Sequence, residues 1–350
     1  MKRNNLNGKS VFYKKFDLLK ESDNNKGGGA IMEKLVNVGI VGLGAVGERL
    51  LHQFVKHPKT IVAAICDTNT SRLNELQAKL DNVNIYTNYN ELISDPSINL
   101  VYVAVPPKFH HRVVMEAAKA GKHILCEKPL ANSLAEAEEM AGAVENANIV
   151  NAINFPLPYS NAVQTFKAKW EAGEIGKLKR VELKMHFPQW PRAWQQNPWI
   201  AGREQGGFIR EITPHYIQVM EDLFGEITYE QSFIDYPDNP EQCETGVIAK
   251  LKLQDGIPVI IDGLSGIGRK EEISFKLYGD KGTLALKNWG QLEGETNEQS
   301  AFPIEAIENN EHQDLISEII KAMENKQSRL VSFKDGYNVQ KVLEQILQHV

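Results

Sequence analysis

The sequence is poor in cysteine and has no long hydrophobic run. Its 350 residues include only three cysteines, which stand far apart at Cys66, Cys126 and Cys243. Thiols this few and scattered do not form a disulfide framework, and they suit a reducing compartment. No run approaches the roughly 18 consecutive apolar residues that a membrane-spanning helix needs. We therefore expect a cytoplasmic protein with no membrane partner.

A basic surface and metal-binding motifs are also missing. The formal net charge is −6, whereas a nucleic-acid partner would require a basic face. The chain has no CxxC or HExxH motif, and its nine histidines do not have the spacing of metal ligands. We expect neither a nucleic-acid partner nor a metal, which leaves small molecules as the ligands.

The first 32 residues differ from the rest in composition. They are rich in Asn and Lys and contain the run Gly27-Gly28-Gly29, but they lack the unbroken apolar core of a secretory signal. This composition predicts a flexible arm over residues 1–32. The alternative is an organellar presequence, a class that avoids acidic residues, whereas this segment holds Asp17, Glu21 and Asp23.

Between residues 33 and 153, short β-branched runs alternate with helical stretches. The expected strands are 36–41, 60–66, 84–86, 100–105 and 123–127, and the expected helices are 45–56, 71–80, 90–94, 111–120 and 133–146. Strand and helix alternation at this spacing predicts βαβ units, and therefore a doubly wound parallel sheet of the Rossmann type with helices on both faces.

Residues 154–350 follow a different pattern, in which strands succeed one another with short turns. The expected strands are 178–187, 228–234, 245–253, 257–265, 272–279 and 282–287, and the expected helices are 161–172, 212–224, 311–325 and 335–348. Such strands predict an α+β domain with a large, mostly antiparallel open sheet. We expect this domain to bind substrate and to support oligomerisation, with the last helix able to pack back on the N-terminal domain.

A glycine-rich turn directly follows the first expected strand, with the sequence Gly42-Leu43-Gly44-Ala45-Val46-Gly47. In such a turn the first Gly permits the tight bend, the second lets the backbone approach a pyrophosphate, and the third permits close helix packing. The helix that follows offers free N–H groups and a positive dipole end to phosphates. Because the motif lies between a strand and a helix, it predicts a dinucleotide site that includes Ala45 and Val46.

The cofactor is expected to be NAD rather than NADP. Asp67 ends the second strand, twenty residues after Gly47, where a carboxylate accepts hydrogen bonds from ribose hydroxyls and repels a 2′-phosphate. Arg72 lies close enough to offset part of that repulsion as a cofactor-binding residue. Its alternative role is that of a solvated charge on a helix.

Two further segments resemble a known family. They are Val105-Pro106-Pro107 with His110, and Ala120-Gly121-Lys122-His123-Ile124-Leu125-Cys126-Glu127-Lys128-Pro129-Leu130-Ala131. Together they resemble the glucose–fructose oxidoreductase/inositol dehydrogenase (Gfo/Idh/MocA) family, and the similarity extends over roughly residues 35–350. The resemblance implies that Lys128 is catalytic and reaches both the reacting oxygen and the nicotinamide. It also implies that Val105, Pro106, His110 and Glu127 line the cofactor site, with an unusual peptide geometry at Pro129.

A second signature of this family carries a carboxylate and an imidazole to the substrate. The matching segment runs from Gly206-Gly207 to Gln218. His215 is kept, Glu211 replaces the family's Asp, and Gln218 replaces its second Asp. Glu211 and His215 are four residues apart, so on a helix they share one face. We expect His215 to exchange the substrate proton, as its ordinary pKa near 6.5 allows, while Glu211 orients a catalytic partner.

The substrate pocket is harder to predict, because the chain departs from the family pattern. Asn154 is kept, but the Arg often found near it is missing, which weighs against a standard sugar or inositol substrate. A loop rich in Trp and Pro precedes Gly206 and is placed to wall the pocket, with the alternative of a packed lid or an interface patch. Its candidate substrate residues are Trp190, Arg192, Trp194 and Arg203.

The sequence thus predicts an NAD(P)-dependent oxidoreductase that transfers a hydride between nicotinamide and a secondary alcohol or ketone. The expected substrate is a small polyhydroxylated molecule of the sugar, sugar acid or cyclitol type. The alternatives are a non-catalytic regulator that senses NAD and an NAD-dependent enzyme that cleaves glycosides or ethers. The exposed face of the second sheet and the family resemblance predict a homodimer or homotetramer.

Overall fold

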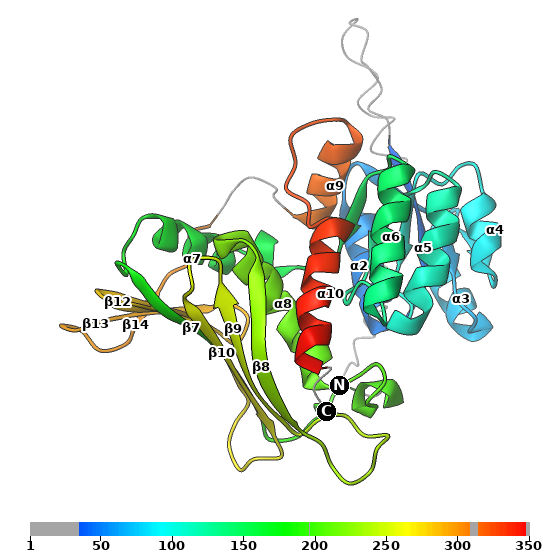
Figure 1. The fold of residues 1–350 in the computed structure, drawn as a ribbon. Coiled ribbons are helices and arrows are strands. Elements are labelled where there is room, and N and C mark those ends of the chain that lie inside the picture. The colour runs from blue at the N-terminus through cyan, green and yellow to red at the C-terminus, as the bar shows by residue number, and fades with distance from the viewer. Residues whose placement is uncertain (1–34, 196, 309–313, 348–350) are drawn as a thin grey trace, which may run out of the picture.

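A computed structural model describes residues 35–195, 197–308 and 314–347. The expected arm at residues 1–32 lies outside this range. Two sheets lie side by side in Figure 1, with the helix α10 (Phe333–Leu347) between them. No helix among the described residues is both long and apolar enough to cross a membrane.

The first sheet is parallel, with six strands in the order β3-β2-β1-β4-β5-β6. The strands are β1 Val36–Val41, β2 Thr60–Cys66, β3 Asn84–Tyr86, β4 Leu100–Val103, β5 His123–Cys126 and β6 Asn151–Ile153. The strand order reverses between β1 and β4, and in such sheets ligands bind at the carboxyl ends of the strands beside this reversal. This confirms the Rossmann-type fold expected from the sequence.

Helices cover both faces of this sheet because each has one apolar stripe. They are α2 Ala45–Lys56, α3 Thr70–Gln77, α4 Tyr89–Ser94, α5 His110–Lys119, α6 Leu134–Asn146 and, from the end of the chain, α9 Leu315–Met323. On α2, Leu51 and Phe54 are completely buried. They belong to one apolar cluster with Ile316 and Ile319 of α9. The C-terminal part of the chain therefore completes one face of the first domain.

The second sheet has eight strands in the order β14-β13-β12-β11-β7-β10-β9-β8. The strands are β7 Leu178–Phe187, β8 Ile227–Asp235, β9 Gly246–Leu253, β10 Pro258–Ser265, β11 Glu272–Gly279, β12 Gly282–Lys287, β13 Gln291–Thr296 and β14 Phe302–Ile304. Neighbouring strands are antiparallel except for β7 and β10. The mostly antiparallel sheet is confirmed, although the sequence pattern did not indicate β13 and β14.

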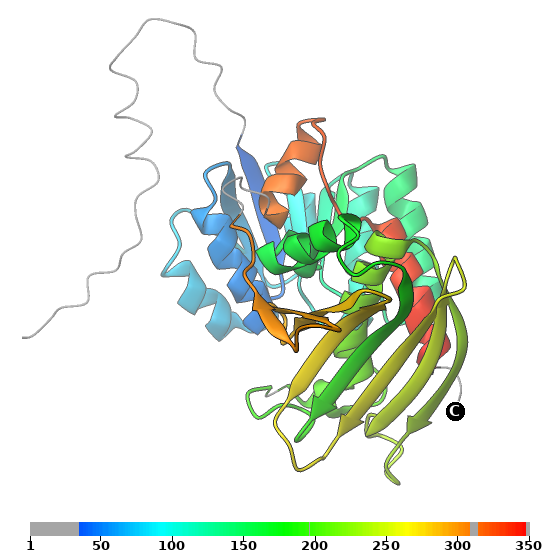
Figure 2. The same cartoon turned by 90° about the vertical axis from the view of Figure 1, so that its left-hand side faces the viewer.

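One face of this sheet is packed against α7 (Asn161–Glu171) and α8 (Phe208–Phe224), and the opposite face is open. The outer face points toward the viewer in Figure 2. It exposes large apolar side chains on three adjacent strands: Phe233 is 64 % exposed, Ile248 53 % and Leu264 38 %.

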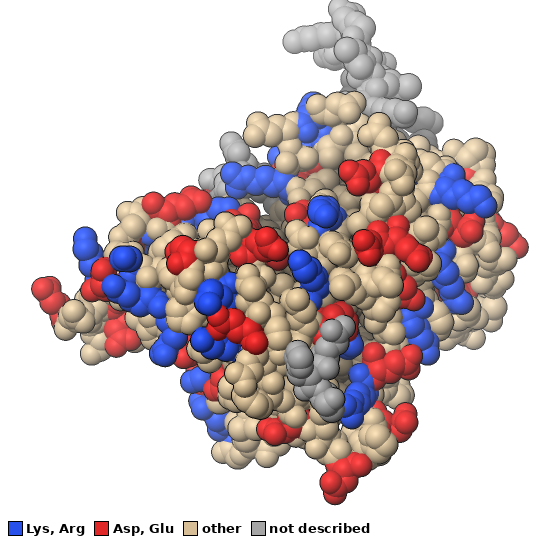
Figure 3. All heavy atoms as spheres, viewed as in Figure 1, with Lys and Arg blue, Asp and Glu red and all other residues tan. Residues whose placement is uncertain are grey.

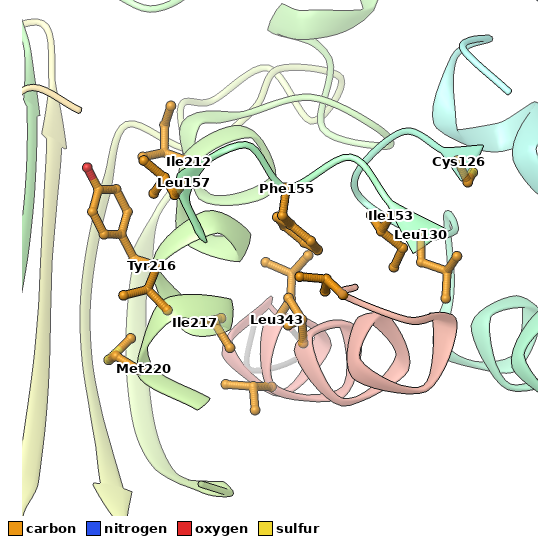
Figure 4. Packing of buried hydrophobic residues seen from close by; sticks show 14 of the residues in the cluster. Cys126, Leu130, Ile153, Phe155, Leu157, Ile212, Tyr216, Ile217, Met220 and Leu343 are labelled. Carbon is orange, nitrogen blue, oxygen red and sulfur yellow. The ribbon is translucent and has the colours of Figure 1, made fainter. Parts of the chain in front are cut away.

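The two domains share a continuous apolar core. Figure 4 shows Leu130, Ile153 and Phe155 above α10, with Phe155 next to Leu343 of that helix and Ile217 of α8 on the other side. The packing is close, because a Cβ on Gly336 of α10 would lie 1.8 Å from an Ile153 methyl carbon. This core packs residues of both domains against one another.

The start of α8 corrects one prediction. The helix begins at Phe208, not at residue 212. Gly207 precedes it with φ 94°, a conformation that glycine adopts readily, and the helix continues through Pro214. The earlier start places Glu211 in the first turn of the helix and His215 one turn later, at the end of α8 that faces the first domain.

Candidate functional site

The glycine-rich turn has the shape that a pyrophosphate needs. Gly42 has φ 98°, and a Cβ there would lie 2.5 Å from the Ala104 carbonyl oxygen, while a Cβ on Gly47 would lie 2.1 Å from the Gly42 carbonyl oxygen. A Cβ on Gly44, in contrast, would meet no atom within 4 Å. Gly44 caps α2 without a side-chain hydrogen bond, and Ala45 and Val46 are exposed. The N-terminus of α2 is therefore free to bind phosphates.

Asp67 is fixed beside this turn. One carboxylate oxygen accepts a hydrogen bond of 2.8 Å from the Leu43 amide, and the other accepts one of 2.9 Å from the Asn69 amide. A carboxylate has about four acceptor positions, so two remain for ribose hydroxyls. These contacts fit the role expected of Asp67 toward an adenosine ribose.

Arg72 is occupied by neighbouring carboxylates. Its guanidinium donates to Glu75 at 2.6 Å and to Glu48, and it reaches the Leu43 carbonyl at 3.4 Å. These partners fit the alternative of a charge on a helix better than they fit a phosphate ligand. Because Arg72 is already paired, it offsets little of the repulsion between Asp67 and a 2′-phosphate.

His110 ties the end of β4 to the turn after β5. Its Nε2 lies 2.8 Å from the Val105 carbonyl oxygen, and its Nδ1 lies 3.1 Å from that of Pro129 and 3.2 Å from that of Leu130. The ring is fully buried, and burial lowers the pKa of His110. Pro129 follows a cis peptide bond. His110 therefore shapes the walls of the site, between Val105 and the turn that carries Lys128.

Lys128 and Glu211 meet across the two domains. The Lys128 Nζ donates to the Glu211 carbonyl oxygen at 3.0 Å and lies 3.4 Å from its carboxylate Oε2. Their side chains are 15 % and 16 % exposed, so both are shielded but still reachable. The sequence placed these residues in one site, and the fold brings them into contact.

His215 lies one turn further along α8. Its ring is edge-on to Phe155 at 5.5 Å and to Trp289 at 5.3 Å between centroids. Its Nδ1 is buried without a hydrogen-bond partner. Burial holds the pKa of His215 well below its usual value, and the positive charges of Lys128 and Arg49 lower it further. The imidazole is therefore neutral near pH 7 and able to accept a proton.

A buried network lies next to Lys128 in the chain. Glu127 accepts hydrogen bonds from the Tyr102 hydroxyl at 2.5 Å and from the Asn154 amide at 2.6 Å. Burial raises the pKa of Glu127, and these two hydrogen bonds oppose the shift. Asn154 was expected to bind substrate, whereas in the structure its amide donates to Glu127. The network fixes the strand end from which Lys128 projects.

The residues of the Trp-rich loop do not converge on Lys128. The Trp190 indole packs on Phe187 and Phe208 and donates to the Ile200 carbonyl at 3.3 Å. Arg192 makes a two-pronged contact with Glu271. The remaining two candidates are placed as follows: Trp194 is 72 % exposed, and Arg203 stacks on Tyr236 at 3.7 Å.

Two further residues shape the site without having been indicated by the sequence pattern, Glu244 and Trp289. Glu244 is 3 % exposed and accepts a hydrogen bond of 2.7 Å from the Ile209 amide, at the start of α8. A Cβ on Gly207 would lie 2.2 Å from the Glu244 carboxylate. Burial raises the pKa of Glu244 to about 7. No periodicity marks a single buried carboxylate, so only the paired glycines hinted at a close neighbour.

Among residues 35–195, 197–308 and 314–347, no group of three or more His, Cys, Asp or Glu side chains is placed to hold a metal ion. The polar groups where the two domains meet are an amine, a carboxylate and an imidazole.

Comparison with known proteins places both domains. The Gfo/Idh/MocA description "Oxidoreductase family, NAD-binding Rossmann fold" matches residues 36–155. The companion description "Oxidoreductase family, C-terminal alpha/beta domain" matches residues 167–350. The two matches cover most of the chain and divide it where the sheets divide.

Individual relatives have low sequence identity to this chain, but the similarity extends over most of its length. Myo-inositol 2-dehydrogenase of Thermotoga maritima is 26 % identical over 260 residues, covering 72 % of this chain and 75 % of that protein. Levoglucosan dehydrogenase of Pseudarthrobacter phenanthrenivorans is 25 % identical over 289 residues, covering 72 % and 73 %. Among solved structures, levoglucosan dehydrogenase in complex with NADH has a TM-score of 0.77 at 21 % identity, covering 90 % of this chain and 96 % of that one.

Proposed function

This chain belongs to the Gfo/Idh/MocA family of oxidoreductases, and we propose that it transfers a hydride between nicotinamide and a secondary alcohol or ketone of a small polyhydroxylated molecule. The observation that carries the proposal is the hydrogen bond of 3.0 Å from the Lys128 Nζ to the Glu211 carbonyl oxygen. The neutral imidazole of His215 lies on α8, the helix that also carries Glu211. The amine and the imidazole come from different domains.

The N-terminal domain is the NAD-binding part of the chain, and its residues fit the cofactor. Gly42, Gly44 and Gly47 leave room at the N-terminus of α2 for the pyrophosphate, and Asp67 keeps two acceptor positions for ribose hydroxyls. When bound, NAD supplies the hydride acceptor or donor. The turn after β5 holds Lys128 at the carboxyl edge of the sheet, the edge at which a nicotinamide lies in folds of this type.

The chain's own groups handle the proton. Oxidation of an alcohol removes a hydride from carbon, for which a bound NAD⁺ would be the acceptor, and a proton from oxygen, which the neutral imidazole of His215 accepts. The ammonium of Lys128 donates a hydrogen bond to the same oxygen and stabilises the developing alkoxide. Glu211 holds that ammonium in place. In the reductive direction His215 returns the proton.

The substrate class follows from the relatives and from the site. The named relatives act on a cyclitol and an anhydrosugar, and both substrates carry secondary hydroxyls on a ring. The groups gathered at this site are an amine, a carboxylate, an imidazole and aromatic rings, which together suit a neutral polyol ring. We include sugar acids in the class, because Lys128 and Arg49 also make the potential near His215 more positive.

The assembly and the location are part of the same proposal. Phe233, Ile248 and Leu264 are exposed together on the open face of the sheet. Single exposed apolar side chains are normal on a protein surface, whereas a group of them is typical of an interface. We propose that a second copy of the chain covers this face, giving a homodimer or homotetramer. Figure 3 shows basic and acidic side chains interspersed over the visible face, in keeping with a small-molecule ligand. The three cysteines are free and buried, which suits the cytoplasm.

Stopped-flow absorbance of reduced nicotinamide tests the proposal. The purified chain is mixed with NAD⁺ and a panel of cyclitols, anhydrosugars, sugar acids and linear polyols. Stoichiometric NADH formation with at least one polyol supports the dehydrogenase. An enzyme that cleaves glycosides through transient oxidation would consume substrate without net NADH, and a regulator would bind NAD without either change. Either of these last two results contradicts the proposal.

A further inference from the structure

The hairpin between β12 and β13 ends in an unusual backbone conformation. Its tip is Asn288-Trp289-Gly290, where Asn288 has φ 46° and Trp289 has φ 73°. This left-handed region is uncommon for a residue as bulky as Trp. The Asn288 amide donates to the Ile273 carbonyl at 2.8 Å, and its side-chain oxygen accepts from the Ile273 amide at 3.2 Å. The tip is thereby fixed to the start of β11.

The strained residue points its ring at the catalytic histidine. The Trp289 indole is edge-on to the His215 imidazole at 5.3 Å and 89°, and it lies 5.7 Å from the Tyr216 ring. Phe155, which follows β6 of the first domain, is edge-on to the same imidazole at 5.5 Å. Two aromatic rings therefore contact the imidazole, and Trp289 is only partly buried.

An observed backbone outlier beside a reactive group is a reason to look for function. Glycine would adopt this turn without strain, so the turn alone does not explain a Trp. Core packing accounts for part of its burial, because the ring contacts Tyr216 and packs against the apolar core, but the residue also keeps exposed surface beside His215. A large flat ring next to a polyol site can pack against the C–H groups of a sugar-like ring.

We propose that Trp289 is a specificity residue: its indole forms the apolar wall of the substrate pocket beside His215 and selects cyclic polyols that turn a C–H face toward it. This inference rests on the proposed function. The same ring keeps water from the imidazole, so the proton of His215 is exchanged with the substrate oxygen. The charged groups acting on His215 are Lys128, from the turn after β5, and Arg49, from α2.

The test uses Trp289→Gly, because glycine suits the left-handed φ and leaves the turn intact. We expect the KM for a cyclic polyol such as myo-inositol to rise about tenfold, the order expected for loss of part of an aromatic contact. The KM for a linear polyol such as sorbitol should change less than threefold, and the NADH affinity should stay the same. For Trp289→Phe, the KM for the cyclic polyol should lie between that of the wild type and that of Trp289→Gly. Trp170→Phe is the matched control, since Trp170 packs on Phe224, at the opposite end of α8.

A second readout needs no turnover. The imidazole of His215 is titrated by NMR in protein with ¹³C-labelled histidine, and His215→Gln assigns its signal. In Trp289→Gly the midpoint should move up toward the ordinary value near 6.5, because water gains access to the ring. An unchanged midpoint, or an unchanged preference for cyclic over linear polyols in an active enzyme, would overturn the role of Trp289. Wild-type protein that never forms NADH would instead overturn the proposed function, whatever the midpoint does.

Discussion

The contact between Gly207 and Glu244 makes a quantitative prediction about the helix that carries the site. In Gly207→Ala, the new Cβ would lie 2.2 Å from the Glu244 carboxylate, and the residue would keep φ 94°. The backbone conformation of Gly207, with φ 94° and ψ 152°, is nearly restricted to glycine and costs a residue with a Cβ about 1–3 kcal/mol. Displacing the carboxylate from the Ile209 amide removes the cap of α8, which costs about 1–2 kcal/mol more. We expect the free energy of unfolding to fall by roughly 3 kcal/mol.

A double-mutant cycle separates these two contributions. In Glu244→Ala the cap is already lost and the space is empty, so adding Gly207→Ala should cost only the backbone contribution, about 1–3 kcal/mol. The two changes should therefore be less than additive, by about 1–2 kcal/mol. Urea unfolding followed by tryptophan fluorescence measures all four proteins. Additive costs would refute the idea that Glu244 occupies the space that these glycines leave.

Four further predictions follow from the site. Glu244 gains a proton on folding because burial raises its pKa from 4.5 to about 7, so its contribution to stability is present below pH 4.5 and is lost as pH rises through about 7. We measure the free energy of unfolding by urea titration between pH 4.5 and pH 8. Over this range the stability of Glu244→Gln relative to the wild type should rise by an amount on the order of 3 kcal/mol, and parallel curves of stability against pH would contradict this. Gly44→Ala should leave the urea midpoint unchanged, because the new Cβ has free space within the protein. The same Cβ would meet the pyrophosphate, so NADH binding measured by calorimetry should weaken about tenfold. An unaltered NADH affinity would place the phosphates elsewhere. Asp67→Ala should improve NADP⁺ affinity relative to NAD⁺ by about tenfold in paired titrations, and an unchanged ratio would remove Asp67 from the ribose site. The acid limb of the kcat/KM profile should lie below pH 6.5, because burial and the Lys128 charge lower the pKa of His215; a limb at or above 6.5 would exclude this histidine as the base.

Much of the first domain could be predicted, because the signals there are local. The strand β1, the helix α2 and the glycines between them follow one another in the sequence, so their geometry is set by neighbours in the chain. The motif around Lys128 was equally recognisable. The parallel sheet then places the carboxyl ends of β1, β4 and β5 along one edge, and the site residues of this domain meet there.

The second domain was predicted in class but not in detail. Strands β13 and β14 are short and partly exposed, so their apolar alternation is weak. The start of α8 was misplaced because a buried carboxylate from the distant residue 244, and not a local side chain, caps the helix. A contact across 35 positions leaves no periodic trace in the sequence.

The substrate wall was the least predictable part of the site. Trp190, Arg192 and Arg203 were chosen because they lie close in sequence to Gly206, yet each pairs with a partner of its own. The ring that reaches His215 comes instead from Trp289, at a hairpin tip 74 residues away. Only the three-dimensional arrangement of the sheet, which brings that tip to α8, identifies this residue.

The catalytic role proposed for Lys128 is the central claim, and replacing this residue tests it most directly. Single-turnover reduction of NAD⁺ is measured for the wild type and for Lys128→Ala, with NADH binding followed in parallel by calorimetry. We predict that NADH affinity stays within about threefold while turnover falls by a factor on the order of a thousand, as for loss of a group that stabilises the alkoxide. Turnover retained within tenfold of the wild type, with NADH still bound, would contradict the account.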